Sequence, residues 1–137
     1  MSPRGTSLKL AGVSEAEEYT IVRLRSGACS VHARSYAETM HPGIGPEAEA
    51  EALYVRQTGL IERLRGHVGE FVIWDIGLGA AANALTALRR SQDLAARLRI
   101  LSFDHTVGPL RFALRHAAEL PHLHGYQEEA DQLIERL

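Results

Sequence analysis

The chain has 137 residues, enough for one domain, and its 45% hydrophobic and 23% charged residues are typical of a water-soluble globular protein. The net charge of −2 excludes a bulk basic excess that would drive nucleic-acid binding, and leaves only a local basic patch open. The single cysteine, Cys29, excludes an internal disulfide and suits a reducing, cytoplasmic compartment. No apolar run approaches the roughly 18 residues that a membrane span needs, so we expect no membrane association.

The first part of the chain predicts an arm and a hairpin. Residues 1–18 lack the apolar core of a signal peptide, and we expect a flexible arm there. Residues 19–34 are rich in β-formers on both sides of the pair Ser26-Gly27. Glycine supplies the positive φ of a tight turn, so this range predicts a β-hairpin.

A loop and a helix follow the hairpin. The segment "AETMHPGIGP", residues 37–46, is predicted to be a loop, because its proline and glycines forbid regular structure. Glu38 within it either reaches a ligand bound nearby or is a solvated loop residue. Residues 46–65 begin with proline, carry acids first and arginines last, and so predict one helix. In that helix Leu53, Leu60, Ile61 and Leu64 share one face.

The segment "EFVIWDIGLGAAANAL" predicts a ligand-binding turn between a strand and a helix. The run "FVIW" is continuously apolar, as in a parallel strand buried on both faces. It ends at Asp75, and Gly77 and Gly79 follow, in a turn that we expect to have no room for side chains. The small residues after them open a helix, whose free N–H groups would face a ligand.

A second strand, "LRILSF", ends at Asp104, and residues 70–104 therefore predict a βαβ unit of a Rossmann-like α/β fold. A carboxylate there can accept both hydroxyls of a ribose. Two further helices are predicted within residues 107–137. His116, His122 and His124 lie close in sequence, but without supporting cysteine or carboxylate spacing, so no metal site is predicted.

Two cofactors compete for this turn. Gly77, Gly79 and Ala82 match a dinucleotide fingerprint, which would make the chain an NAD-binding oxidoreductase fragment. The acid at Asp75 would repel a pyrophosphate, whereas it would attract the sulfonium and ammonium groups of S-adenosylmethionine. Asp75 therefore favours S-adenosylmethionine. A non-catalytic interaction protein on a degenerate Rossmann-like fold is the third alternative.

These segments resemble a known family. "FVIWDIGLGAAANAL" resembles the first motif of class I S-adenosylmethionine-dependent methyltransferases, acid-x-Gly-x-Gly-x-Gly, with Ala81 in place of the third glycine. It is more narrowly similar to the MnmC-like group, which modifies the wobble uridine of tRNA. That group's acid, Gly-x-Gly and Asn are matched by Asp75, Gly77, Gly79 and Asn83. "LRILSFD" resembles the second motif, which implies that Asp104 binds the ribose, and "GPLRFALRHAAELPHL" resembles the helix that follows.

The resemblance covers residues 30 to 137 and implies a partial domain. The family's sheet has seven strands in the order 3-2-1-4-5-7-6, and only the first two have counterparts here. We therefore expect residues 19–137 to form a methyltransferase domain truncated after its second parallel strand. The resemblance implies S-adenosylmethionine as cofactor and tRNA as substrate, and it identifies no catalytic residue. We expect the chain alone to be inactive, and either to dimerise, to need a C-terminal half, or to cover its first strand's bare edge with the hairpin.

Overall fold

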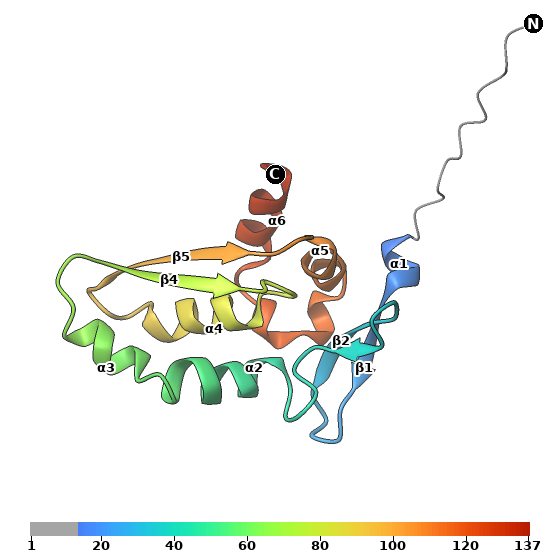
Figure 1. Ribbon diagram of the computed structural model, residues 1–137, viewed down its shortest axis with the longest axis horizontal. Coiled ribbons are helices and arrows are strands. Elements are labelled where there is room, and N and C mark those ends of the chain that lie inside the picture. Colours follow the sequence, from blue (N-terminus) through green and yellow to red (C-terminus); the bar gives the residue numbers. More distant parts are fainter. Residues whose placement is uncertain (1–13) are drawn as a thin grey trace, which may run out of the picture.

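The computed structural model describes residues 14–137, and Figure 1 shows its two small sheets and surrounding helices. The strands are β1 (Tyr19–Arg23), β2 (Cys29–Ala33), β3 (Glu38–Thr39), β4 (Glu70–Ile76) and β5 (Arg97–Phe103). The helices are α1 (Glu15–Glu18), α2 (Pro46–Ala50), α3 (Leu60–Arg65), α4 (Ala82–Ser91), α5 (Gly108–Arg115) and α6 (Gln127–Glu135). A π-helical turn, η1 (Glu51–Arg56), and two 3₁₀ turns, η2 (Ala117–Glu119) and η3 (Pro121–Leu123), complete the chain.

The N-terminal arm predicted over residues 1–18 is only partly described. Residues 1–13 lie outside the described residues. The remainder contains α1, which corrects the expectation of a flexible segment there. The Ser14 backbone N–H and hydroxyl both donate to the Glu17 carboxylate, each at 2.9 Å, and this local cap satisfies the start of the helical turn.

The predicted hairpin is confirmed. β1 and β2 pair antiparallel, from Tyr19 opposite Ala33 to Arg23 opposite Cys29. Gly27 supplies the positive φ of the turn, at 88°. The loop predicted over residues 37–46 is wrong at its start, because Glu38 and Thr39 form β3, which pairs with the end of β2 and makes a three-stranded sheet.

The helix predicted over 46–65 is wrong as a single element. Gly59 adopts a left-handed conformation, with φ at 61°, and separates α2 and η1 from α3. The wider π turn also shifts the side chains around the helix axis relative to an α-helix. Leu53 is consequently exposed, while Leu60 and Leu64 are buried, so the predicted apolar face is not continuous.

The predicted parallel pair is confirmed as β4 and β5, with Glu70 opposite Arg97 and Ile76 opposite Phe103. Helix α4 lies under one face of this sheet, and α2 and α3 lie beneath α4 (Figure 1). Phe71 and Ile73 of β4 pack on the apolar cluster that these helices form. This α/β arrangement is that of a Rossmann-like βαβ unit.

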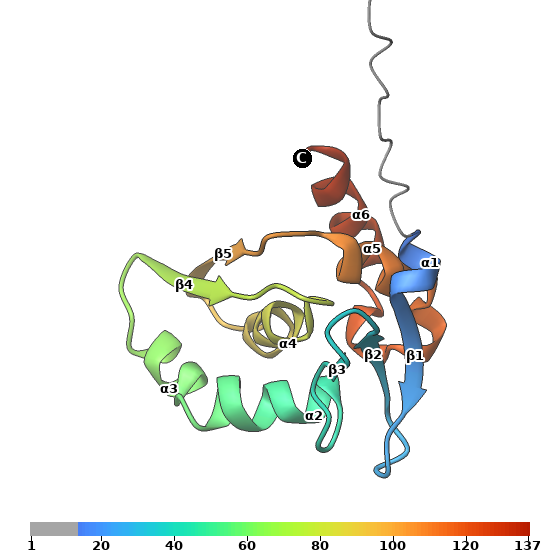
Figure 2. The same cartoon turned by 45° about the vertical axis from the view of Figure 1, so that its right-hand side comes forward.

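The other face of the β4–β5 sheet is uncovered among the described residues, which corrects the expectation of a strand buried on both faces. Val72, Trp74 and Ile76 of β4 are exposed there. The hairpin does not pair with β4 either, because it belongs to the separate β1-β2-β3 sheet. It lies beside α5, at the carboxyl ends of β4 and β5 (Figure 2).

The two helices predicted within 107–137 are shorter than expected. The turns η2 and η3 separate α5 from α6 and place His122 in the core, where it is almost completely buried. Its ring Nε2 lies 2.9 Å from the Ala80 carbonyl, and a carbonyl can only accept, so Nε2 donates. His122 therefore holds the turn that precedes α4.

Across residues 14–137, no helix combines the length and apolarity needed to traverse a bilayer.

We predict that His122 makes stability pH-dependent. Burial lowers its pKa to about 4, although the Ala80 carbonyl opposes this shift. An unfolded histidine titrates near 6.5, so the unfolded state binds more protons between these values. The contribution of His122 to the free energy of unfolding is fully present above about pH 6.5. About 3 kcal/mol of it is lost as the pH falls to about 4.

Urea unfolding at neutral pH and at about pH 4.5 measures this loss. His122→Gln keeps an N–H donor toward Ala80 but removes the titrating ring, so its stability should fall less between the two conditions. An equal fall in the parent and in His122→Gln would show that His122 does not cause the pH dependence.

Candidate functional site

The turn between β4 and α4 folds back onto the end of β5. The N–H groups of Gly77 and Leu78 both donate to the Phe103 carbonyl, at 2.8 and 3.3 Å. Gly77 and Gly79 have φ of 88° and 53°. A Cβ added at Gly77 would meet no atom within 4 Å, so the expectation of a crowded turn is wrong there. Glycine is needed at this position for its backbone conformation.

Ala81 occupies the place of the family's third glycine and still adopts the left-handed conformation, with φ at 64°. A non-glycine residue is disfavoured there by roughly 1–2 kcal/mol. The Ala81 N–H donates to the Leu78 carbonyl at 2.8 Å, and its side chain is buried in the main core. The surrounding packing therefore holds the turn in the glycine-like conformation.

The carboxylate of Asp104 ties this turn to the end of β5. Its Oδ2 accepts a hydrogen bond from the Gly79 N–H at 2.9 Å. Its Oδ1 accepts from the N–H groups of His105 and Thr106, at 2.7 and 3.4 Å. Burial works to raise the pKa of Asp104, but these three N–H donors and the nearby His105 ring outweigh it and lower the pKa. Asp104 is therefore ionised at neutral pH.

A pocket of about 210 Å³ lies at this point, between the hairpin sheet and the two strand ends. It brings together three of the residues predicted from the sequence, namely Glu38, Gly79 and Asp104. Its other lining residues were not predicted from the sequence, and they are Tyr19, Ala33, Tyr36, Met40, His105, Thr106 and Pro109. Tyr19, Ala33, Tyr36 and Met40 come from the hairpin sheet or from the segments that join and follow its strands, and the long-range docking of this sheet has no signal in the local sequence.

Met40 lies over the glycine turn. A Cβ built on Gly79 would come within 3.4 Å of the Met40 sulfur. A ligand that crosses Gly79 therefore meets this side chain first. Methionine is flexible and can change rotamer at low cost, so the contact is displaceable.

The other predicted residues lie elsewhere. Asp75 and Asn83 line a separate pocket of about 370 Å³ beside β4, and Gly77 lines neither pocket. Asp75 accepts a hydrogen bond from the Ser102 hydroxyl at 2.7 Å. Burial raises the pKa of Asp75, and the nearby Asp104 charge adds to this effect. The Asn83 side-chain oxygen is buried and has no hydrogen-bond partner among the described residues.

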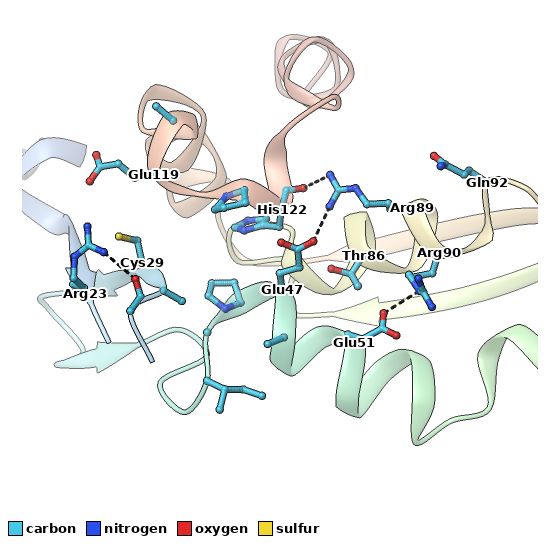
Figure 3. Close-up of a pocket in the computed structure, with 18 of the residues that line it drawn as sticks. Arg23, Cys29, Glu47, Glu51, Thr86, Arg89, Arg90, Gln92, Glu119 and His122 are labelled. Carbon is cyan, nitrogen blue, oxygen red and sulfur yellow. Dashed lines mark hydrogen bonds and ion pairs between the residues drawn. The ribbon is translucent and has the colours of Figure 1, made fainter. Parts of the chain in front are cut away.

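A larger cavity, of about 1010 Å³, lies away from the strand ends, between the hairpin turn and helices α2 and α4 (Figure 3). Arg89 forms an ion pair with Glu47 at 3.5 Å and donates to the His122 and His124 carbonyls. Arg90 pairs with Glu51 at 3.1 Å. These arginines join neighbouring elements and already have partners. We therefore place the candidate site in the smaller pocket, where the carboxylates of Glu38 and Asp104 lie beside Gly79.

The three histidines noted in the sequence have other contacts. His124 lies 2.9 Å from the Ala117 carbonyl, and His116 lies 3.5 Å from the Glu119 carboxylate. Across residues 14–137, no group of three histidine, cysteine or acidic side chains is arranged to hold a metal ion.

Comparison with known proteins supports the fold. No family model matches the sequence, and no curated protein matches it. Among solved structures, the crystal structure of MnmC2 from Aquifex aeolicus is similar, with a TM-score of 0.57 and 22% sequence identity. The match covers 87% of this chain and 37% of that chain. The chain thus has an MnmC-like fold and spans a little over a third of the length of this neighbour.

We predict that Asp104→Ala lowers the free energy of unfolding by about 1–3 kcal/mol, because it leaves the N–H groups of Gly79, His105 and Thr106 without their acceptor. Asp93, an exposed aspartate after α4, offers a matched control. Asp93→Ala should change stability by less than about 0.5 kcal/mol. Urea unfolding at neutral pH compares the two, and equal effects would contradict a tethering role for Asp104.

Proposed function

We propose that this chain is the S-adenosylmethionine-binding part of a methyltransferase, with the cofactor at the pocket of Glu38, Gly79 and Asp104. One observation carries the proposal: two carboxylates and a bare glycine backbone line one pocket at the carboxyl ends of parallel strands. Ligands of open α/β sheets bind at this end. The MnmC-like fold agrees with the resemblance of the sequence motifs to the same group.

The charge of the pocket distinguishes the candidate cofactors. Glu38 and Asp104 are its acids, and its lining residues include no lysine or arginine. Asp104 stays ionised because its N–H donors lower its pKa. S-adenosylmethionine carries a sulfonium and an ammonium group, which such a pocket attracts, whereas the pyrophosphate of NAD would be repelled. This favours the methyltransferase proposal over the oxidoreductase alternative.

Each residue would have a distinct part in binding. The Asp104 oxygens have lone pairs beyond those that the backbone uses, and these can accept the ribose hydroxyls. Glu38 can accept a hydrogen bond from the ammonium group, and Gly79 lets the ligand approach the backbone closely. Bound S-adenosylmethionine supplies a methyl group on a positively charged sulfur. The pocket is smaller than the roughly 300–1,000 Å³ usual for such sites, so we expect Met40 to move on binding.

The acceptor is a further proposal. The resemblance to the MnmC-like group points to the wobble uridine of tRNA. Methyl transfer requires the acceptor to be held in line with the methyl group. We have identified no residue between 14 and 137 that would position an acceptor, and we therefore propose that the chain alone binds the cofactor without transferring its methyl group.

Isothermal titration calorimetry tests the proposed site. We expect S-adenosylmethionine to bind, S-adenosylhomocysteine to bind more weakly because it lacks the sulfonium charge, and NAD not to bind. Asp104→Asn and Glu38→Gln should each weaken binding by about tenfold or more, through loss of a charge-assisted hydrogen bond. Glu119→Gln, in the larger cavity, is the control and should have no effect.

The outcomes separate the alternatives. Binding of NAD in place of S-adenosylmethionine would support the oxidoreductase fragment. If none of the three ligands binds, the non-catalytic interaction protein is the better account. Equal loss of affinity in Glu119→Gln and Glu38→Gln would show that the site is assigned to the wrong pocket.

A further inference from the structure

The cavity between the hairpin turn and helices α2 and α4 is separate from the proposed cofactor pocket, and we call it the hairpin–helix cavity (Figure 3). Its volume of about 1010 Å³ is at the upper end of the range usual for ligand sites. The residues that line it differ from those that line the cofactor pocket. A ligand here would therefore occupy a second site.

Thr86 of α4 brings a hydroxyl group to this cavity that no other described residue uses. Thr86 is 3% exposed, and its hydroxyl oxygen has no hydrogen-bond partner among residues 14–137. Figure 3 shows this oxygen turned into the cavity, on the side of Glu47. A buried hydroxyl without a partner costs free energy, and a ligand that bonds to it would remove this cost.

His122 adds a second polar atom without a partner. The residue is 1% exposed and lines the cavity, and its ring Nε2 donates to the Ala80 carbonyl at 2.9 Å. In the neutral ring, a proton on Nε2 leaves Nδ1 as an acceptor only. Nδ1 has no hydrogen-bond partner among residues 14–137. The cavity thus contains one hydroxyl and one ring acceptor that are both available to a ligand.

The charged side chains of the cavity nearly balance one another. Its lining residues include three arginines and four acids. Arg89 pairs with Glu47 at 3.5 Å, and Arg90 pairs with Glu51 at 3.1 Å. A phosphate group would be repelled by the carboxylates, and a polyamine would be repelled by the guanidinium groups. The cavity therefore favours an uncharged ligand.

We infer that the hairpin–helix cavity binds an uncharged mono- or disaccharide. A sugar hydroxyl both donates and accepts, so it can bridge a carboxylate and a guanidinium group without adding charge. A second hydroxyl can donate to Nδ1 of His122, and a third can bond to the Thr86 hydroxyl. The exposed amide of Gln92 offers a further donor and acceptor at the cavity wall. One polyhydroxylated ring can thus satisfy several of these groups together.

Two-dimensional amide NMR locates the binding and requires no cofactor, so the result is independent of the proposed function. The probes are D-glucose, D-galactose, sucrose and trehalose, with inorganic phosphate and spermidine as charged comparisons. At least one sugar should shift the amide signals of Gly27, Ala28 and Gly45, which line the cavity, until they saturate. The amide signals of His105 and Thr106, at the cofactor pocket, should not shift.

The chain offers a matched pair of variants. Thr86→Val removes the hydroxyl and keeps the shape of the side chain, so the dissociation constant of the sugar should rise by about fivefold or more. Because this hydroxyl has no partner in the protein, the variant should unfold at the same or a higher urea concentration than the parent. Thr20→Val makes the same change at a half-buried residue of β1 outside the cavity and should leave the constant unchanged.

Three results would overturn the inference. If no sugar gives a saturable shift of the Gly27, Ala28 and Gly45 signals, the cavity contains only water. If phosphate or spermidine shifts these signals and no sugar does, the balance of charge does not select the ligand. If Thr86→Val binds the sugar as tightly as Thr20→Val does, the ligand does not use the buried hydroxyl.

Discussion

The hydrogen bond from the Gly79 N–H to the Asp104 carboxylate is the interaction on which the candidate site depends. It joins the turn that leaves β4 to the segment that leaves β5. The same carboxylate also fixes the start of the loop into α5, through the N–H groups of His105 and Thr106. One acid thus aligns both strand ends, and its own charge is stabilised by the donors that it aligns.

The hairpin completes this arrangement from outside the βαβ unit. It contributes Glu38 and Met40 to the pocket, and its Tyr19 ring packs against Phe112 of α5 with centroids 5.8 Å apart. His122 supports the same turn from beneath by holding the Ala80 carbonyl. The pocket therefore lies where the hairpin, the turn after β4 and the segment after β5 meet. Its two acids are brought together only by the folding of the chain.

The sequence predicted those features that depend on neighbouring residues. The pair Ser26-Gly27 located the hairpin turn, and the run from Phe71 to Gly79 located β4 and the turn after it. It missed the break at Gly59, because a strong amphipathic pattern on both sides conceals one left-handed residue. The apolar run of β4 shows that both its faces can be buried, but it does not identify what covers them.

The candidate site was predictable to a similar degree. Asp104 and Gly79 follow from strand ends and turn chemistry, and Glu38 from its loop. Tyr19, Tyr36 and Met40 could not be found, because their approach to the turn depends on how the hairpin docks. Asp75 was predicted to face a ligand, yet its carboxylate bonds to Ser102 and lines a different pocket. Its side chain therefore links β4 to β5 in this structure.

We propose that the cofactor binds where Asp104 meets the glycine turn. The most direct measurement is a two-dimensional amide NMR spectrum recorded while S-adenosylmethionine is added. The amide signals of Gly79, His105 and Thr106 should shift together with one dissociation constant, because all three donate to the Asp104 carboxylate. The amide signals of Gly27, Ala28 and Gly45, which line the cavity between the hairpin turn and helices α2 and α4, should not shift. Shifts confined to that second group, or no shifts at all, would contradict the account.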